Sequence, residues 1–146
     1  RLREEHGRQS RDLQAFDHIH VMVTDRQAAE AWYIRVLGLQ RVPELALWAA
    51  DGGPLTLSDP SNRIHLALFE RPRQNCRSTI ALRVSAQAFV EWQAHLEAEL
   101  GTAPELEDHD LSWSLYFSDP DGNPYEITTY EYREAGARLH GAAHGA

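Results

Sequence analysis

Three side chains of types that commonly bind divalent metals stand at related positions in this chain. His18 lies in a stretch of alternating apolar residues, His65 follows a Ser-Asp-Pro sequence at residues 58–60, and Glu126 follows a second Ser-Asp-Pro sequence at residues 118–120. Each Ser-Asp-Pro is followed by an Asn, and the His or Glu comes three residues after that Asn. Imidazole and carboxylate groups suit mid-row divalent metals, so this spacing indicates metal chemistry.

The repetition extends beyond the two turns. Residues 55–69 resemble residues 115–130, and residues 17–24 superpose on residues 78–85 with an offset of 61. Self-similarity at a fixed period is typical of duplicated structural units. We therefore expect two copies of one module.

The same offset of 61 pairs the candidate residues. It relates His18 to Thr79, and His65 to Glu126. By strand alternation, all four side chains are predicted to point away from the face that the helices cover. Two modules turned against each other would then form a cleft lined by the first and last strands of each module.

The elements that must position these residues follow from local patterns. In the first copy an alternating strand leads to Thr24 and Gln27, which fit a capping box that opens a helix, and Gly38 is a natural end to that helix. Residues 39–50 offer one or two strands interrupted by Pro43, and two more strands follow.

The second copy repeats this order. Ser85 is expected to cap a helix that Gly101 ends, a weak strand and two clear strands follow, and residues 131–146 are interpreted as a loose tail. The predicted fold class is α+β, with two βαβββ modules forming a cleft-shaped, partly open mixed β-barrel with helices outside. The expected segments are an N-terminal extension at 1–15, a first module at 16–70, a linker at 71–77, a second module at 78–132 and a C-terminal tail at 133–146.

Composition limits the classes of function. A chain of 146 residues that is 42% hydrophobic can build one compact domain or two small modules with a shared core. The net charge of -8 argues against nucleic acid as the main partner, because phosphate binding needs a basic surface. No apolar run suits a membrane span, no signal peptide is visible, and Cys76 is alone, so we expect a cytoplasmic protein.

The stretches FDHIHVMVTD, AWYIRVLGL and YFSDPDGNPYEITTY carry a resemblance to a known family. Over roughly residues 16–132 the chain resembles the vicinal-oxygen-chelate superfamily, which includes glyoxalase I, fosfomycin- and bleomycin-resistance proteins and extradiol ring-cleaving dioxygenases. The resemblance implies paired βαβββ modules around a divalent metal, a small-molecule substrate with adjacent oxygens, and a homodimer.

Site residues follow from the resemblance one position at a time. His18 matches the first-strand His ligand, and Glu126 matches the last-strand Glu ligand. Thr79 stands where ring-cleaving and glyoxalase-like members usually carry a second His, and its neutral hydroxyl is a weak ligand. His65 matches a carboxylate position of glyoxalase-like members. The implied metal set is His18, His65 and Glu126, with Fe(II) or Mn(II) favoured and Zn(II) or Ni(II) as alternatives.

The catalytic residues implied by resemblance to extradiol dioxygenases are Tyr116 and His109. The remaining cleft-facing side chains are expected to line the substrate pocket: His20, Thr79, Arg83, Thr128 and Tyr130. Structural alternatives exist for several of these residues. They include a Glu126–Arg83 ion pair, a His18 ring bonded to a backbone carbonyl, a packed Tyr116 and a surface His109.

Three functions therefore remain open. The first is a metal-dependent enzyme most like an extradiol ring-cleaving dioxygenase, with a glyoxalase-type lyase or isomerase as the related alternative. The second is a metal-free small-molecule-binding protein of the bleomycin-resistance kind, which Thr79 favours. The third is an interaction domain with a filled cleft.

Overall fold

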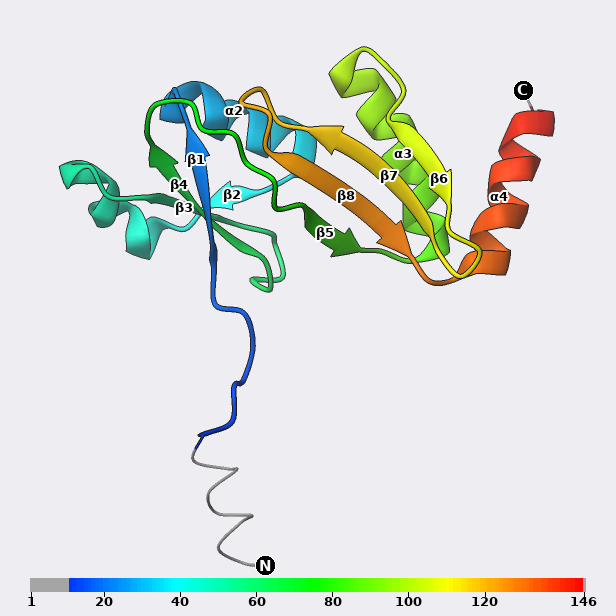
Figure 1. Ribbon diagram of the computed structural model, residues 1–146, viewed down its shortest axis with the longest axis horizontal. Coiled ribbons are helices and arrows are strands. Elements are labelled where there is room, and N and C mark those ends of the chain that lie inside the picture. The colour runs from blue at the N-terminus through cyan, green and yellow to red at the C-terminus, as the bar shows by residue number, and fades with distance from the viewer. Residues whose placement is uncertain (1–10, 146) are drawn as a thin grey trace, which may run out of the picture.

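The computed structural model describes residues 11–145, which form two modules of matching order (Figure 1). The predicted N-terminal extension lies mostly outside the described residues. The first module consists of β1 (Ile19–Val23), α2 (Arg26–Leu37), β2 (Gln40–Arg41), the 3-10 helix η1 (Pro43–Asp51), β3 (Leu55–Ser58) and β4 (His65–Glu70). The second module consists of β5 (Ile80–Arg83), α3 (Ala86–Leu100), β6 (Glu105–Asp108), β7 (Trp113–Ser118), β8 (Pro124–Thr129) and α4 (Tyr132–Gly145).

The two sheets have the same topology. The first has strand order β1-β4-β3-β2 and the second β5-β8-β7-β6, with β1 parallel to β4 and β5 parallel to β8. The prediction of an α+β fold with two βαβββ modules is confirmed. Within residues 11–145 the two four-stranded sheets stay separate and do not close into a barrel, which is consistent with an open, cleft-shaped fold.

The two modules share one hydrophobic core. Buried side chains from the helix-covered face of each sheet and from both helices form a single cluster, which includes Val36, Leu66, Phe89 and Ile127. The helices also touch directly, because His95 on α3 donates to the backbone carbonyl of Val36 at 2.8 Å. Each sheet therefore has one face in the shared core and an open face on its other side.

The second Ser-Asp-Pro turn fastens the modules together. Asp119, which is buried, accepts a hydrogen bond from the hydroxyl of Tyr33 on α2 at 2.6 Å, and that hydroxyl lies 2.7 Å from the hydroxyl of Tyr125. Asn123 donates from Nδ2 to the carbonyl of Met22 at 3.0 Å. Burial, followed by the nearby Tyr125 and Asp119, raises the pKa of Tyr33 far above its ordinary value. The side chains of Asp119 and Asn123 thus connect the second module to the first.

The start of α2 differs from the predicted capping box. Asp25 is the N-cap, and its side chain accepts from the backbone N–H of Ala28 at 3.1 Å. Thr24 instead donates from its hydroxyl to Asp121 in the second module at 2.7 Å. The predicted end at Gly38 is confirmed, because Gly38 takes the left-handed conformation with φ of 70°.

Two segments were predicted wrongly. Residues 43–51 form the 3-10 helix η1 and only Gln40–Arg41 pair as a strand, because Pro43 starts a helical turn. The expected loose tail is the helix α4. Its residue Ala135 is fully buried, and a Cβ at Gly136 would lie 3.6 Å from the indole ring of Trp113. Close packing on the sheet compensates for the low helix propensity of glycine.

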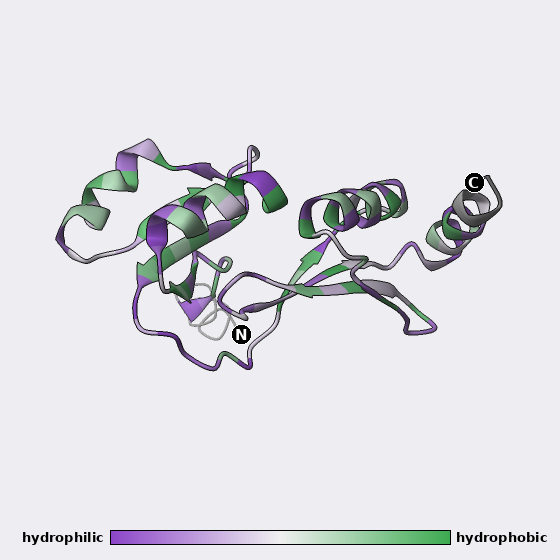
Figure 2. Ribbon diagram, turned by 90° about the horizontal axis from the view of Figure 1, so that it is seen from above, coloured by the Kyte–Doolittle hydropathy of each residue, from purple (hydrophilic) through white to green (hydrophobic). Residues whose placement is uncertain are grey.

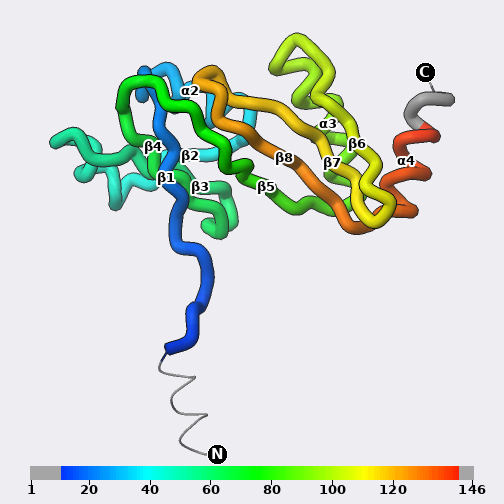
Figure 3. Tube along the Cα trace, viewed as in Figure 1, coloured from blue at the N-terminus to red at the C-terminus, as the bar shows by residue number. Residues whose placement is uncertain are grey.

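The connection between the modules is polar. Residues 71–79 join β4 to β5 and are mainly hydrophilic in Figure 2. On the N-terminal side of β1, residues 11–18 extend away from the two modules (Figure 3). Within the described residues, no helix combines the length and apolar character that a bilayer span requires.

Candidate metal and substrate site

The open face of the first sheet carries a group of histidines beside β1. His18 directly precedes β1, and its Nδ1 lies 2.7 Å from Oδ2 of Asp17. With Nδ1–H donating to that carboxylate, the lone pair of Nε2 accepts from the neighbouring His20 ring, and a metal bound at Nε2 would replace this hydrogen bond. Nε2 of His18 lies 3.0 Å from Nε2 of His20, whose ring packs on Phe69 with centroids 4.6 Å apart.

His65 reaches the same face from the start of β4. Its Nε2 donates to Oδ1 of Asn62 at 2.8 Å, which leaves Nδ1 as the free ring nitrogen. Asn62 itself has φ of 60°, a conformation that Asn tolerates better than most residues. Asp17, His18, Thr56 and His65 form the polar side of a cavity of about 180 Å³ on this face.

The pairing register changes one predicted equivalence. Ile19 pairs with Leu66 in the first sheet, and Ile80 pairs with Tyr125 in the second. Ile19 and Ile80 occupy the same position in their modules, so their partners Leu66 and Tyr125 also correspond. The next residues, Ala67 and Glu126, therefore correspond to each other. The predicted equivalence of His65 with Glu126 is wrong. His65 still points to the open face, because residues 65 and 67 lie on the same side of β4.

Glu126 occupies the middle of the open face of the second sheet. Its carboxylate accepts a hydrogen bond from Ser114 Oγ on the neighbouring strand β7 at 2.6 Å. Thr128 follows on the same face and donates from its hydroxyl to the carbonyl of Trp113 at 3.1 Å. Ser114 thus orients one oxygen of Glu126, and the carboxylate retains lone pairs for another ligand.

Tyr116 and His109 meet beside this carboxylate. Tyr116 is the cross-strand partner of Glu126, and its hydroxyl lies 2.9 Å from Nε2 of His109. Partial burial raises the pKa of Tyr116, and the charges of Glu126 and Glu107 raise it further. At neutral pH the phenol is therefore protonated and can donate to His109, whose ring also lies 3.6 Å from Glu107.

The remaining predicted pocket residues lie at the edge of this face. The guanidinium of Arg83 lies over the ring of Tyr130, 4.9 Å from its centroid. Within the part of the chain that the structure describes, no ion pair joins Arg83 to Glu126. Thr79 is exposed and stands one residue before β5.

The implied metal ligands lie on two different sheets. Among residues 11–145 no cluster of three or more His, Cys, Asp or Glu side chains could hold a metal ion. The donor chemistry nevertheless suits a divalent metal, because His18 is oriented by a carboxylate and Glu126 by a hydroxyl, as metal ligands commonly are. We therefore describe two half-sites: a histidine half-site of His18 and His65, and a carboxylate half-site of Glu126, Tyr116 and His109.

Sequence reasoning missed several side chains of these half-sites. Asp17 adjoins His18, and Ser114 lies two residues before Tyr116 on the same strand face, so adjacency and strand alternation were signals for both. Glu107 faces Ser114 across the β6–β7 pair, a register that the sequence does not specify.

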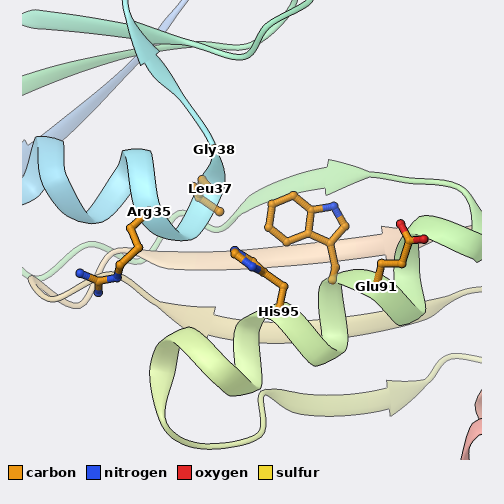
Figure 4. Close-up of a pocket in the computed structure, with 6 residues that line it drawn as sticks. Arg35, Leu37, Gly38, Glu91 and His95 are labelled. Carbon is orange, nitrogen blue, oxygen red and sulfur yellow. The ribbon is translucent and has the colours of Figure 1, made fainter.

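A separate cavity of about 320 Å³ lies where α2 meets α3 (Figure 4). His95 points from α3 toward α2, Arg35 extends from α2 away from His95, and Glu91 lies nearer the start of α3 (Figure 4). His95 is bonded to α2 and Arg35 forms an ion pair with Glu99 at 3.0 Å. These contacts join the modules, and none of the predicted site residues lines this cavity.

Comparison with known proteins agrees with this architecture. A sequence model described as the Glyoxalase/Bleomycin resistance protein/Dioxygenase superfamily matches residues 15–127. The match covers most of the chain, and the chain belongs to this superfamily.

Solved structures share the fold at low sequence identity. A glyoxalase/dioxygenase from Nostoc punctiforme is 22% identical with a TM-score of 0.63, covering 82% of this chain and 92% of its own. A lactoylglutathione lyase from Agrobacterium tumefaciens is 24% identical with a TM-score of 0.59, covering 81% and 95%. The fosfomycin resistance protein FosX from Listeria monocytogenes, described as a complex with Mn(II) and sulfate, is 16% identical with a TM-score of 0.60, covering 88% and 99%. These likenesses establish the fold.

Proposed function

We propose that this chain is a divalent-metal-dependent enzyme that acts on a small molecule with adjacent oxygens, by chemistry most like extradiol ring cleavage. The observation that carries the proposal is the 2.9 Å contact between Tyr116 and His109 beside Glu126. An acid-base pair next to a metal-capable carboxylate suits a substrate that must lose a hydroxyl proton while its oxygens are held. A structure with Mn(II) in the same superfamily supports a mid-row metal.

The proposed roles follow from the contacts of each side chain. His18, His65 and Glu126 would hold Fe(II) or Mn(II), which would supply Lewis-acid stabilisation of negative charge on the substrate oxygens. On substrate binding Tyr116 would release its hydrogen bond to His109 Nε2, which would then accept the proton of a substrate hydroxyl, with Glu107 stabilising the imidazolium that results. Tyr116, kept protonated, would donate a hydrogen bond to the oxygen left behind. Arg83 and Tyr130 would border the substrate at the rim.

We further propose that the active form is a homodimer in which the histidine half-site of one copy faces the carboxylate half-site of the other. The strands β1 and β5 end their sheets, so each has an edge without a strand neighbour in its own sheet. Free strand edges are templates for pairing with another chain. Ahead of β1, Leu13 and Phe16 are 97% and 93% exposed, which also favours a partner.

Metal analysis and oxygen uptake test the enzyme proposal. Protein purified without chelator, or reconstituted with Fe(II), Mn(II) or Zn(II), is expected to retain metal. The Fe(II) or Mn(II) form is expected to consume oxygen with catechol, and the Zn(II) form, which has no redox chemistry, is not. His109→Gln and Tyr116→Phe should keep the metal and lose roughly 10²-fold or more in rate. If the wild-type protein retains none of the three metals, the proposal is wrong.

Complementation tests the shared site. His18→Ala and Glu126→Gln are each expected to be inactive alone. After unfolding and refolding as a mixture, one of the two sites in each mixed dimer would have both residues, so roughly a quarter of wild-type activity should return. A site built within one chain would give no recovery.

Thr79 supports the second candidate, a metal-free small-molecule-binding protein. It is exposed, directly before β5, and offers only a neutral hydroxyl where ring-cleaving relatives usually carry a ligand. This candidate predicts small-molecule binding that is unchanged by EDTA and by Glu126→Gln.

A further inference from the structure

The 3-10 helix η1 covers part of the open face of the first sheet and gives the cavity there an apolar wall. Leu45 and Trp48 from η1, together with Pro54 and Ala67, line the cavity that His18 and His65 also line. Trp48 is 50% exposed, although it is the largest apolar side chain of this wall. A half-exposed indole over an apolar recess offers a flat surface to a ligand.

This wall is held in place at its C-terminal end. Arg26 on α2 donates to the carbonyl of Ala49 at 3.1 Å and to the carbonyl of Gly53 at 2.9 Å. Gly53 has no room for a side chain, because a Cβ there would overlap the backbone carbonyl oxygen of Trp48. The backbone that carries Trp48 is thus restrained before any ligand arrives, which reduces the entropy lost on binding.

The size of the cavity limits the ligand. Its volume is about 180 Å³. An apolar cavity of about 150 Å³ holds a benzene molecule, so a single six-membered ring fits here. A ring packed on Trp48 would direct its substituents across the cavity toward His18 and His65.

We propose that Trp48 is a specificity-determining residue, and that the site selects a single planar aromatic ring with adjacent oxygens over a saturated ring of the same size. This inference rests on the proposed function, since it assigns the ring-binding wall of the same site. Ala67 contributes by being small, because a longer side chain at this position would fill the recess.

Binding under argon tests the inference without turnover. Catechol and cis-1,2-cyclohexanediol are titrated calorimetrically into wild-type, Trp48→Ala, Trp48→Phe and Leu47→Ala proteins, each with and without Mn(II). Trp48→Ala should bind catechol ~10-fold more weakly, whereas Trp48→Phe should stay within about 3-fold of wild type. Leu47→Ala is the matched control, since Leu47 adjoins Trp48, is 69% exposed and does not line the cavity.

The outcomes separate this inference from the proposed function. Three outcomes would each overturn the role of Trp48. Trp48→Ala and Leu47→Ala could lose the same affinity for catechol, Trp48→Ala could lose as much affinity for the saturated diol as for catechol, or the wild type could fail to bind catechol. Mn(II) affinity is measured in the same series and should not change in Trp48→Ala. Catechol binding that depends on Trp48 in a protein that takes up no metal would support the inference and refute the metal-dependent enzyme.

Discussion

Removing the hydroxyl of Tyr33 should destabilise the whole molecule, because this group ties α2 to the second Ser-Asp-Pro turn. It donates to Asp119 at 2.6 Å and contacts the hydroxyl of Tyr125 at 2.7 Å, and all three residues are buried. Tyr33→Phe keeps the ring and deletes only these bonds. A hydrogen bond to a charged group contributes about 1.5–3 kcal/mol, and a buried hydroxyl left unpaired costs about 1–3 kcal/mol.

In Tyr33→Phe, Asp119 still accepts hydrogen bonds from other donors, which limits the loss of stability. The backbone N–H groups of Asp121 and Asn123 and the side-chain amide of Asn123 still reach its carboxylate. We therefore expect a decrease of about 3 kcal/mol in the free energy of unfolding for Tyr33→Phe. Tyr125→Phe removes only the neutral partner and should cost about 1 kcal/mol.

Urea unfolding followed by far-UV circular dichroism measures both variants. With a slope of about 1.5 kcal/mol per M, the midpoint of Tyr33→Phe should fall by about 2 M at constant slope. Tyr132→Phe is the matched control, because its hydroxyl bonds to Asp108 at 2.7 Å in a solvent-exposed pair. Equal shifts for Tyr33→Phe and Tyr132→Phe would refute the reasoning, since burial would then not decide the cost.

Three further predictions concern pH and metal. Partial burial raises the pKa of Asp59, but hydrogen bonds from Ser61, Ile64 and Arg63 outweigh it and hold that pKa at about 2. The resulting stabilisation is full above pH about 4 and lost as pH falls toward 2, so Asp59→Asn should flatten the acid branch of a urea-midpoint-versus-pH curve. Burial raises the pKa of Tyr33, so this residue contributes its full stabilisation of the folded state below pH about 10 and loses it above that pH. Tyr33→Phe should therefore flatten the alkaline branch of the same curve. Asp17→Asn should lower Mn(II) affinity by about 10-fold in calorimetric titration with little change in stability, whereas an unchanged affinity would mean that Asp17 does not orient His18.

The module order could be predicted because it depends on local signals. Alternation around Val21 and Leu66, caps at Ser85, and terminators at Gly38 and Gly101 are each contained within a few residues. The wrongly predicted segments depend on tertiary contacts instead. The helix α4 gains its burial at Ala135 from the second module, and Thr24 pairs with Asp121 almost a hundred residues away, so Asp25 takes over as the cap of α2.

The site was predictable in part for the same reason. Strand alternation placed His18, His65 and Glu126 on open faces, and these placements agree with their contacts in the structure. The wall formed by Trp48 was not predicted, because residues 39–50 were interpreted as strands rather than as a helical turn over the sheet. Which faces meet depends on how whole modules dock, and no local sequence pattern encodes that.

The register of the two Ser-Asp-Pro turns explains why the half-sites differ. Ser58 pairs with His65 across the first turn, while Ser118 pairs with Pro124 across the second, so the first turn is one residue longer. That residue moves His65 to the end of its strand and brings Ala67 to the position that Glu126 holds in the second module. A small side chain there leaves the recess beneath Trp48, and the carboxylate at the equivalent place in the second module would supply the proposed ligand. The two modules thus differ at this position, one with a recess and the other with a charged group, as the proposed site between two copies would require.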